Sequence, residues 1–395
     1  MIPRLMMPEL LDAAREYPVV TVFGPRQSGK TTLVRAAFPD KPYRSLEEPD
    51  VRLAAQQDPR GFLAGYPEGA VLDEIQRVPE LLSYIQSLVD QRRARGHFIL
   101  TGSHQPALHQ AVSQSLAGRT AVLTLLPFAW DELRHYQPAL APFELIVQGC
   151  FPRLHEDRLQ SDRFFNSYIQ TYVERDVRAL INLKDLRRFQ QFLVLLAGRV
   201  GQLLNYSSLG NDVGVSSTTI KDWIAALTAS FLVFELPPYF ENIGKRVIKS
   251  PKLYFLDTGI AAHLAGIRTA EQCRRDPLRG GLYENLVIVE ILKRRLNRGQ
   301  RPDLYFYRDS RGNEVDLLIR EGATLTPVEI KSAATFSDEF HTGIRRFRET
   351  VGGKASGGAI LYDGPDAFQF KEARVFNPLT HAGLETWCPQ TGSSR

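Results

Sequence analysis

The segment from residue 19 to residue 38 combines a short strand, a glycine-rich turn and a helix. Residues 19–23 (VVTVF) form a β-branched run that is typical of a buried parallel strand. This run continues directly into GPRQSGKT at residues 24–31, which matches the pattern G-x-x-x-x-G-K-[ST] in the required strand–loop–helix context. Glycines allow the backbone to curl so that its N–H groups face phosphates. The feature therefore predicts a buried parallel strand that is joined to a helix by a phosphate-binding loop.

The residues of this loop predict a site for ATP and Mg²⁺. Lys30 is expected to neutralise charge on the β- and γ-phosphates, and the hydroxyl of Thr31 to ligate Mg²⁺. The start of the following helix adds positive potential. A turn that binds no nucleotide is the alternative. The residues expected to hold the nucleotide are Gly24, Pro25, Arg26, Gln27, Ser28, Gly29, Lys30, Thr31 and Thr32.

Two further strands are expected to bring polar side chains to the same edge of the sheet. Residues 70–72 end in Asp73 and Glu74, so we assign Asp73 to the Mg²⁺ shell and Glu74 to the base that polarises the attacking water. A solvated acidic turn is the alternative. Residues 98–100 lead to Ser103, which we expect to sense the γ-phosphate unless it merely forms a turn.

Arg119 precedes another apolar strand at residues 121–126. An arginine in such a position can reach the γ-phosphate of a neighbouring subunit as an arginine finger. A surface arginine held in a salt bridge is an equally acceptable interpretation of the same residue.

These segments together resemble a known family. GPRQSGKTTL, LDEIQ, LTGS, LAGRT followed by LLPFAW, and GCFPR are similar to bacterial and archaeal AAA+ ATPases that carry a C-terminal DUF4143 domain. The resemblance runs through nearly the whole chain, and the ATPase motifs are its most specific part. The resemblance implies an α/β fold whose ATPase core is a parallel sheet flanked by helices. It also implies ATP hydrolysis in an oligomeric ring, often a hexamer. We expect an AAA+ core at 1–146, a helical connector at 147–190, a winged-helix-like domain at 191–268 and a restriction-endonuclease-like domain at 275–390.

The middle of the chain predicts a DNA-binding element. Residues 208–227 read as two helices around a sharp turn at Gly214, a helix-turn-helix pattern. A wing-like hairpin follows, in which residues 242–256 hold Lys245, Arg246, Lys249 and Lys252 and no acid. A rigid extension of the ATPase is the structural alternative. The candidates for DNA contact are Ser217, Thr218 and Lys221 on the second helix and Lys245, Arg246 and Lys249 in the wing. Arg175 is a further candidate for nucleotide or subunit contact, or for a local salt bridge.

The back third predicts a cluster of carboxylates and a lysine. Strands at 304–308, 314–320 and 325–331 follow a helix that starts at about residue 281. Alternation along strands allows Asp316, Glu329 and Lys331 to converge, with Glu284 supplied by the helix. Such a set can hold Mg²⁺ against a phosphodiester, and it resembles the PD-(D/E)xK nuclease fold. Binding of nucleic acid without cleavage, and a plain docking surface, remain alternatives.

Charge and cysteine content set the broad class. Residues 151–300 hold 22 lysines and arginines against 15 acids, while the whole chain has a net charge of +5. This excess favours an anionic partner, which we expect to be duplex or branched DNA. Three scattered cysteines fit a reducing cytoplasm, and the sequence predicts neither a secretion signal nor a membrane span. The leading hypothesis is an ATPase that remodels or translocates DNA. An ATP-regulated nuclease and a nucleotide switch acting through protein contacts are the alternatives.

Overall fold

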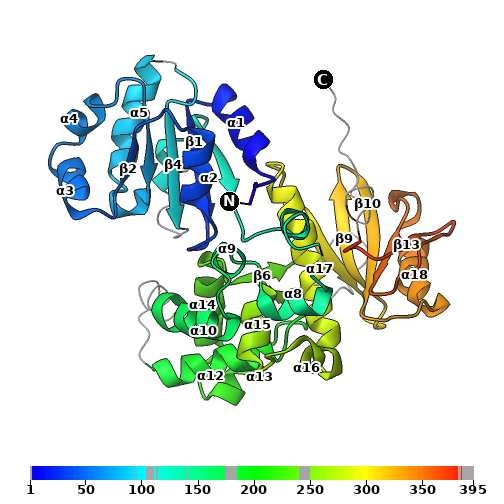
Figure 1. Ribbon diagram of the computed structural model, residues 1–395. Coiled ribbons are helices and arrows are strands. Elements are labelled where there is room, and N and C mark those ends of the chain that lie inside the picture. The colour runs from blue at the N-terminus through cyan, green and yellow to red at the C-terminus, as the bar shows by residue number, and fades with distance from the viewer. Residues whose placement is uncertain are drawn as a thin grey trace.

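The computed structural model describes residues 2–92, 94–103, 111–112, 114–138, 140–173, 185–239, 250–380 and 384. Figure 1 shows a core sheet, a helical middle part and a C-terminal sheet. Of the helices in the described part of the chain, not one combines the length and the apolar character that crossing a bilayer requires.

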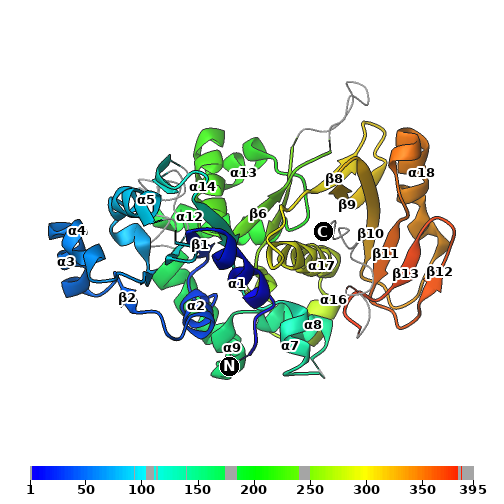
Figure 2. The ribbon, with the colours of Figure 1, turned by 90° about the horizontal axis from the view of Figure 1, so that it is seen from above.

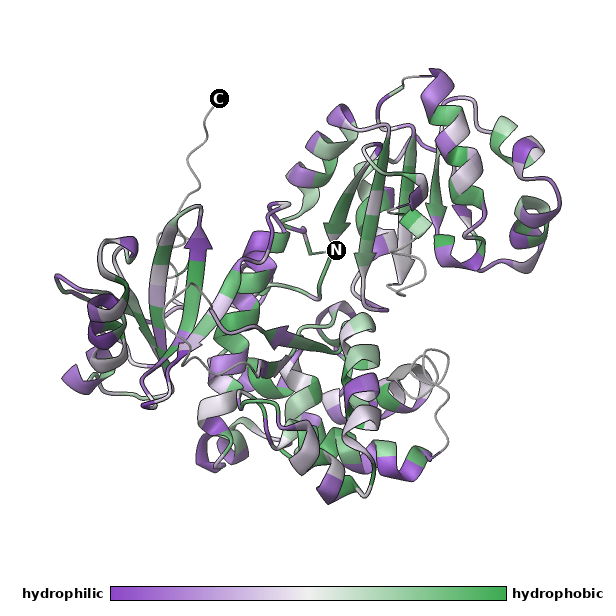
Figure 3. Ribbon diagram, turned by 180° about the vertical axis from the view of Figure 1, so that it is seen from behind, coloured by the Kyte–Doolittle hydropathy of each residue, from purple (hydrophilic) through white to green (hydrophobic). Residues whose placement is uncertain are grey.

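The N-terminal part is built on a five-stranded parallel sheet, as the sequence predicts. The strand order is β2-β3-β4-β1-β5. The strands are β1 (Val19–Gly24), β2 (Tyr43–Ser45), β3 (Ala70–Asp73), β4 (Phe98–Ser103) and β5 (Thr120–Thr124). Strands β1, β3 and β4 are buried along their whole length, which explains their continuous apolar sequences. Figure 3 shows that the strands of this sheet are largely hydrophobic.

Helices cover both faces of this sheet. Alternate residues of β1 divide between the faces, because Val20 and Val22 pack in one cluster with Leu10 and Leu33, whereas Phe23 packs in another. Helices α1 (Met7–Glu16) and α2 (Lys30–Ala37) contribute to the first cluster. The other elements of the core are α3 (Pro49–Gln57), α4 (Pro59–Ala64), η1 (Ile75–Arg77) and α5 (Leu81–Arg92).

The middle part is mainly helical. Its helices are α7 (Trp130–Arg134), α8 (Pro142–Gln148), α9 (Pro152–Glu156), α10 (Ser161–Tyr168), the π-helical turn η2 (Ile169–Val173), α12 (Leu186–Ala197), α13 (Tyr206–Val213), α14 (Ser217–Ala229), α15 (Thr258–Leu264) and α16 (Ala270–Arg275). Helices α13 and α14 are joined at Gly214, which has a left-handed backbone, and the Ser216 side chain caps α14 by accepting from Thr219 N. The antiparallel strands β6 (Val233–Leu236) and β7 (Lys252–Phe255) follow.

The C-terminal part is a mixed six-stranded sheet. Its order is β12-β13-β11-β10-β9-β8. The strands are β8 (Leu304–Arg308), β9 (Glu314–Glu321), β10 (Thr324–Lys331), β11 (Ala359–Tyr362), β12 (Phe368–Gln369) and β13 (Arg374–Phe376), and the helical elements are α17 (Arg279–Leu296), η3 (Asp338–His341), α18 (Thr342–Val351) and η4 (Gly352–Lys354). The first three strands agree with the sequence prediction to within one residue at each end.

Helix α17 lies between the helical part and the C-terminal sheet (Figures 1 and 2). A single hydrophobic cluster includes residues from α8, α12, α14, α17 and the strands of the C-terminal sheet. The predicted boundaries at 190/191 and 268/275 therefore do not separate independent cores. Glu290, Lys293 and Arg294 on α17 are buried, although each carries a charged side chain. They are tolerated because each has a charged or backbone partner.

Buried polar contacts join α17 to the segment that leaves the core sheet. The Lys293 ammonium donates to the carbonyl of Phe128 (2.8 Å) and to Glu290 (2.7 Å). Glu290 also accepts from the backbone N–H of Trp130 at 2.6 Å. Arg294 pairs with Asp131 on α7, where both side chains are almost completely buried. Burial leaves such charges dependent on one another, so α7 and α17 are held in a fixed relation.

Candidate functional site

The phosphate-binding loop lies between β1 and α2, and its shape requires glycine at both ends. Gly24 has φ of 156°, and a methyl group on it would come within 2.1 Å of the carbonyl oxygen of Leu125. Gly29, which caps α2, has φ of 91°. Both positions exclude ordinary side chains for steric or conformational reasons. The loop is thus compelled to turn tightly before Lys30.

Lys30 points back over the loop from the first turn of α2. Its ammonium donates to the carbonyls of Gly24 (3.1 Å) and Pro25 (2.8 Å). Burial lowers the pKa of Lys30 below that of an ordinary lysine. The hydroxyl of Ser28 is also buried, and it has no hydrogen-bond partner among the described residues. A cation and an unsatisfied hydroxyl on a tightly turned loop fit a phosphate group.

Asp73 stands at the end of β3 and connects three elements. Its Oδ2 atom accepts from Thr31 Oγ1 at 2.9 Å and from the Tyr43 hydroxyl at 2.7 Å. Its Oδ1 atom accepts from the hydroxyl of Thr101 on β4. The structure therefore brings together Thr31 and Asp73, the two residues that the sequence assigns to Mg²⁺, and this oxygen-rich pair suits a hard cation.

Glu74 follows Asp73 in a left-handed conformation, with φ of 59°. Non-glycine residues seldom adopt this conformation, and they do so most often where function requires it. The carboxylate accepts from the Gln76 amide and from Ser103 Oγ, the latter at 3.3 Å. Ser103 therefore lies beside the candidate base, at the edge of the sheet where the sequence places both residues.

A cleft of about 460 Å³ opens beside these groups. Helix α9 contributes the opposite wall and lies next to the core sheet in Figure 1. The cleft is lined by Arg26, Gln27, Gly29, Lys30, Thr31, Thr32, Glu47, Glu74, Pro152, Arg153, Glu156 and Thr171. Six of the nine residues predicted to hold the nucleotide line it, along with the candidate base. Because its two walls come from the core and from the helical part, a ligand here would contact both.

Arg119 lies away from this cleft in the single chain. Its guanidinium donates to both carboxylate oxygens of Asp90 on α5, at 2.6 and 2.9 Å. This contact lowers the pKa of Asp90 through the hydrogen bonds that Arg119 donates. The surface salt bridge is thus the state of Arg119 in one chain, and its action on a neighbouring subunit stays a prediction.

The candidate DNA-binding residues are described only in part. Thr218 and Lys221 are exposed on α14, and Ser217 is half-buried at its start. The Lys221 ammonium lies 5.4 Å from the centre of the Tyr206 ring. The predicted wing residues Lys245, Arg246 and Lys249, and the candidate Arg175, lie outside the described residues.

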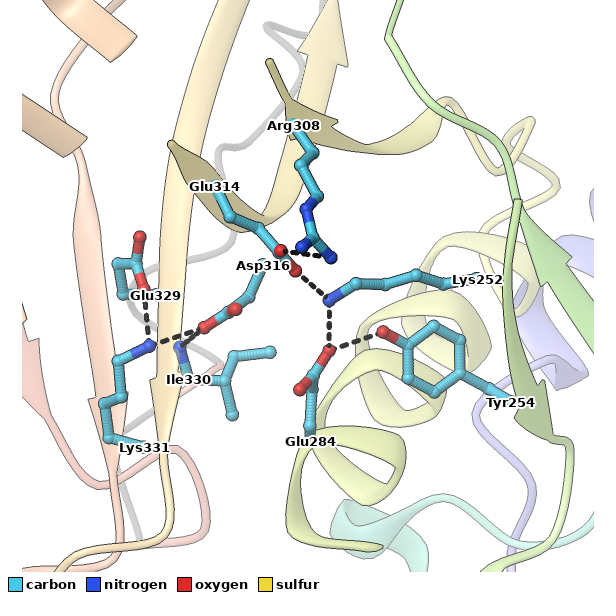
Figure 4. A network of polar contacts seen from close by, with 9 residues as sticks. All are labelled: Lys252, Tyr254, Glu284, Arg308, Glu314, Asp316, Glu329, Ile330 and Lys331. Atoms are coloured by element: carbon cyan, nitrogen blue, oxygen red, sulfur yellow. Dashed lines mark hydrogen bonds and ion pairs between the residues drawn. The ribbon is translucent and has the colours of Figure 1, made fainter. Parts of the chain in front are cut away.

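Three of the four predicted nuclease-like residues meet directly in the C-terminal sheet (Figure 4). The Lys331 ammonium contacts Asp316 at 2.9 Å and Glu329 at 2.5 Å. The backbone N–H of Ile330 also donates to Asp316, at 2.8 Å. Asp316 on β9 and Glu329 and Lys331 on β10 therefore converge, as strand alternation predicts.

The fourth residue, Glu284, faces a lysine from the helical part. Lys252 on β7 contacts Glu284 at 3.0 Å and Glu314 at 2.6 Å, and the Tyr254 hydroxyl donates to Glu284. Lys252 stands in the basic segment that the sequence interprets as a wing, but its side chain is 4% exposed and contacts carboxylates instead of facing solvent. We call the charged cluster the group formed by Lys252, Glu284, Glu314, Asp316, Glu329 and Lys331.

The charged cluster is compensated only in part, because it combines two lysines with four carboxyl groups. Burial, and then the negative charge of Asp316, raise the pKa of Glu329 well above its ordinary value, which favours its protonated form. Burial disfavours the charged form of Lys252, but Glu284 and Asp316 outweigh it and raise its pKa. Among the described residues no group of three or more histidines, cysteines, aspartates or glutamates has the arrangement of a metal site. In this arrangement the carboxylates serve as partners of two ammonium groups.

Similarity to known proteins agrees with the geometry. Residues 16–134 match the model of an AAA domain, residues 141–271 a domain of unknown function (DUF8612), and residues 279–382 a domain of unknown function (DUF4143). An uncharacterized protein of Mycobacterium tuberculosis is 31% identical over 326 residues, which are 82% of this chain and 72% of the relative. The chain belongs to the family of AAA proteins with a C-terminal DUF4143 domain.

More distant relatives and solved structures complete the comparison. An uncharacterized protein of Haemophilus influenzae is 25% identical to this AAA protein over 239 residues, which are 57% of each chain. Among solved structures, the Walker-type ATPase of Pyrococcus abyssi is 16% identical, covers 67% of this chain and 96% of its own, and has a TM-score of 0.44. A DNA replication initiation factor is 15% identical, covers 54% and 69%, and has a TM-score of 0.25.

Several residues of the AAA site escaped sequence reasoning. Tyr43 and Thr101 hold Asp73, and Gln76 holds Glu74. Thr101 had a signal, since it stands in the same TGS segment as Ser103 at the end of β4. Tyr43 had none, because β2 is a three-residue edge strand. Arg4, which contacts the phosphate-binding loop, stands 20 residues before it and belongs to no motif.

We expect Glu74→Gln to lower the rate of ATP hydrolysis about 10²- to 10⁴-fold, because an amide cannot take a proton from water. Binding of ATP should persist, since Lys30 and Thr31 are unchanged. Steady-state hydrolysis and calorimetric titration with ATP measure the two effects. The matched control is Glu80→Gln, an exposed glutamate after the same strand. Equal rates in both variants would refute the role of Glu74.

We expect the stability of the C-terminal part to fall as the pH rises above about 4.5, the ordinary pKa of glutamate, because Glu329 keeps its proton in the folded state after the unfolded chain has lost it. Glu329→Gln removes this contribution. Urea unfolding measured over a pH series should therefore show that the free energy of unfolding of the variant increases relative to that of the wild type as the pH rises. Glu349→Gln, an exposed change on α18, should follow the wild type. Parallel curves for Glu329→Gln would contradict the raised pKa.

Proposed function

We propose that this AAA protein binds ATP with Mg²⁺, hydrolyses it in an oligomeric ring, and uses the energy to remodel DNA or move along it. The observation that carries the hydrolytic part is the meeting of Thr31, Asp73 and Glu74 beside Lys30 at one edge of the core sheet. A phosphate-binding loop, a cation-binding pair and a base are the parts that phosphoryl transfer to water requires.

Each side chain has a role that follows from its position. The backbone N–H groups of the loop after Pro25 and the Lys30 ammonium bind the β- and γ-phosphates. Thr31 and Asp73 would hold Mg²⁺, which supplies positive charge to the phosphate oxygens when bound. Glu74 orients the attacking water and accepts its proton, while Ser103 and Gln76 hold the carboxylate in place. The left-handed backbone at Glu74 fixes the direction of this carboxylate without a flexible loop.

The position of the cleft supports a transfer of movement to the helical part. Arg153 and Glu156 of α9 line the same cleft as Lys30. Loss of the γ-phosphate changes the charge that this wall faces, so the core and α9 would rearrange during the cycle. In the proposed ring, Arg119 would exchange Asp90 for the γ-phosphate of the neighbouring subunit.

The DNA part of the proposal rests on the middle of the chain. Helices α13 and α14 meet around a tight turn and precede an antiparallel strand pair, an arrangement that supports the winged-helix interpretation. Thr218 and Lys221 are exposed on α14, where they can contact phosphates. The positive excess of residues 151–300 favours the same partner.

Addition of duplex or branched DNA should raise the rate of ATP hydrolysis, because a bound substrate couples to the cleft. Lys221→Ala should weaken DNA binding and reduce the slope of log K against log salt by about 1. Arg15→Ala, which removes an exposed arginine of α1, is the control. Binding is measured by fluorescence anisotropy at several salt concentrations. Indifference to every DNA, together with assembly that depends on ATP, would instead support a nucleotide switch that acts through protein contacts.

A second candidate function is Mg²⁺-dependent cleavage of DNA under control of ATP. The contact of Asp316, Glu329 and Lys331 favours it, because these residue types converge as in nucleases of the PD-(D/E)xK type. We expect any cleavage that depends on Mg²⁺ or Mn²⁺ to disappear in Asp316→Ala and to persist in Glu74→Gln. Gel assays on duplex, single-stranded and branched DNA test this. Cleavage that survives Asp316→Ala would assign the activity elsewhere.

A further inference from the structure

The segment before α1 runs against the outside of the phosphate-binding loop, and Arg4 fills the contact. The side chain of Arg4 is 7% exposed. Its Nη1 atom donates to the carbonyl of Ser28 and its Nη2 atom to the carbonyl of Leu126, both at 2.7 Å. Its Nε atom donates to Glu132 at 3.0 Å. All three nitrogens of the guanidinium are therefore engaged by partners from three different segments.

The carbonyl of Ser28 is the part of the loop that most needs such a donor. When successive N–H groups of a loop turn toward a phosphate, the carbonyls between them turn outward. An outward carbonyl that is buried requires a donor, and a charged donor makes the stronger hydrogen bond. Arg4 supplies it immediately before Gly29 and Lys30. A methyl group added to Gly29 would lie 3.3 Å from Nη1 of Arg4, so the guanidinium rests directly on this bend.

Glu132 on α7 keeps the guanidinium in position. Its Oε1 atom accepts from Arg4 and from the backbone N–H of Leu5 at 2.7 Å, and its Oε2 atom accepts from the N–H of Ala129 at 2.7 Å. The ion pair is almost completely buried, and the Glu132 side chain is 0% exposed. Because Glu132 balances the positive charge of Arg4, the guanidinium acts on the loop by its geometry more than by its net charge.

The same segment also touches the opposite wall of the cleft. The backbone N–H of Ile2 donates to Glu156 at 3.0 Å, and Glu156 on α9 lines the cleft with Lys30. Residues 2–4 thus contact the loop on one side and α9 on the other. A movement of the phosphate-binding loop or of α9 would therefore displace the segment that carries Arg4.

We propose that Arg4 is a positioning residue of the nucleotide site, which holds the phosphate-binding loop in the shape that receives the β- and γ-phosphates of ATP. This inference rests on the proposed binding of ATP at the loop. Arg4 does not touch the nucleotide; it acts through the carbonyl of Ser28. When the Arg4 side chain is removed, the loop relaxes to other shapes. Part of the free energy of ATP binding is then needed to restore the binding shape, so the affinity for ATP falls.

The test compares the full-length wild type with Arg4→Ala and Arg4→Lys, and with Arg15→Ala as the control for loss of an exposed arginine from the same region. For Arg4→Ala we expect the KM for ATP to rise about 10- to 100-fold, as the loss of a charged hydrogen bond implies, with a smaller change in kcat. Arg4→Lys keeps the charge but not the planar fork, so we expect it to show most of the same rise. Arg15→Ala should match the wild type.

Addition of millimolar guanidinium to Arg4→Ala should lower the KM toward the wild-type value, because the ion can occupy the emptied place and donate to Ser28. A merely structural role would reduce the fraction of folded enzyme, seen by thermal unfolding, and leave the KM of the folded fraction unchanged. That result would overturn the inference, as would a raised KM that guanidinium does not lower. If Arg4→Ala fails to fold, the KM of Arg4→Lys for ATP tests the inference instead, and a KM equal to that of the wild type would overturn it.

Lys30→Ala separates this inference from the proposed function. If the wild type binds ATP and Lys30→Ala does not, the loop is a nucleotide site, and an unchanged KM in both Arg4 variants then refutes the role of Arg4 alone. If the wild type itself does not bind ATP by calorimetry, the proposed function fails.

Discussion

The burial of Lys30 over its own loop is the constraint on which the nucleotide site depends. An ammonium that leaves water must be paired, and here the carbonyls of Gly24 and Pro25 receive it. They can do so because the chain folds back at Gly24, where the nearby carbonyl of Leu125 leaves no room for a side chain. The position of the segment after β5 and the shape of the loop are therefore parts of one arrangement. Asp73 extends it, since its carboxylate joins β2, β4 and the start of α2.

Charged side chains are also buried far from the nucleotide site, and those described above have partners that offset their charge. Lys293 and Arg294 on α17 have partners in the segment between the core sheet and α8. Within the charged cluster, Lys252 and Lys331 pair with the carboxylates from two different sides. Such pairs contribute little net stability, because desolvation opposes their attraction, but they penalise any arrangement that separates the partners. They therefore fix how the core, the helical part and the C-terminal sheet are placed.

The features that could be predicted from the sequence are those that short local patterns determine. The loop, the acids after β3 and the alternation in β9 and β10 are encoded within a few residues, and the structure places them accordingly. Contacts between distant segments were not accessible: nothing near Arg119 indicates Asp90 on α5, and nothing near Lys252 indicates Glu284 and Glu314. The identity of a basic residue does not indicate whether its side chain is solvated or buried, because that depends on how other elements pack around it. Arg4 was missed for this reason.

The shared core around α17 has a consequence for how such proteins can change over generations. Apolar residues of this helix pack with those of the helical part and of the C-terminal sheet in a single cluster. A gene rearrangement that exchanged the C-terminal sheet for an unrelated domain would remove packing partners of α17 and leave buried side chains of this helix facing solvent. Substitutions in α17 are therefore constrained by the helical part and by the C-terminal sheet at the same time.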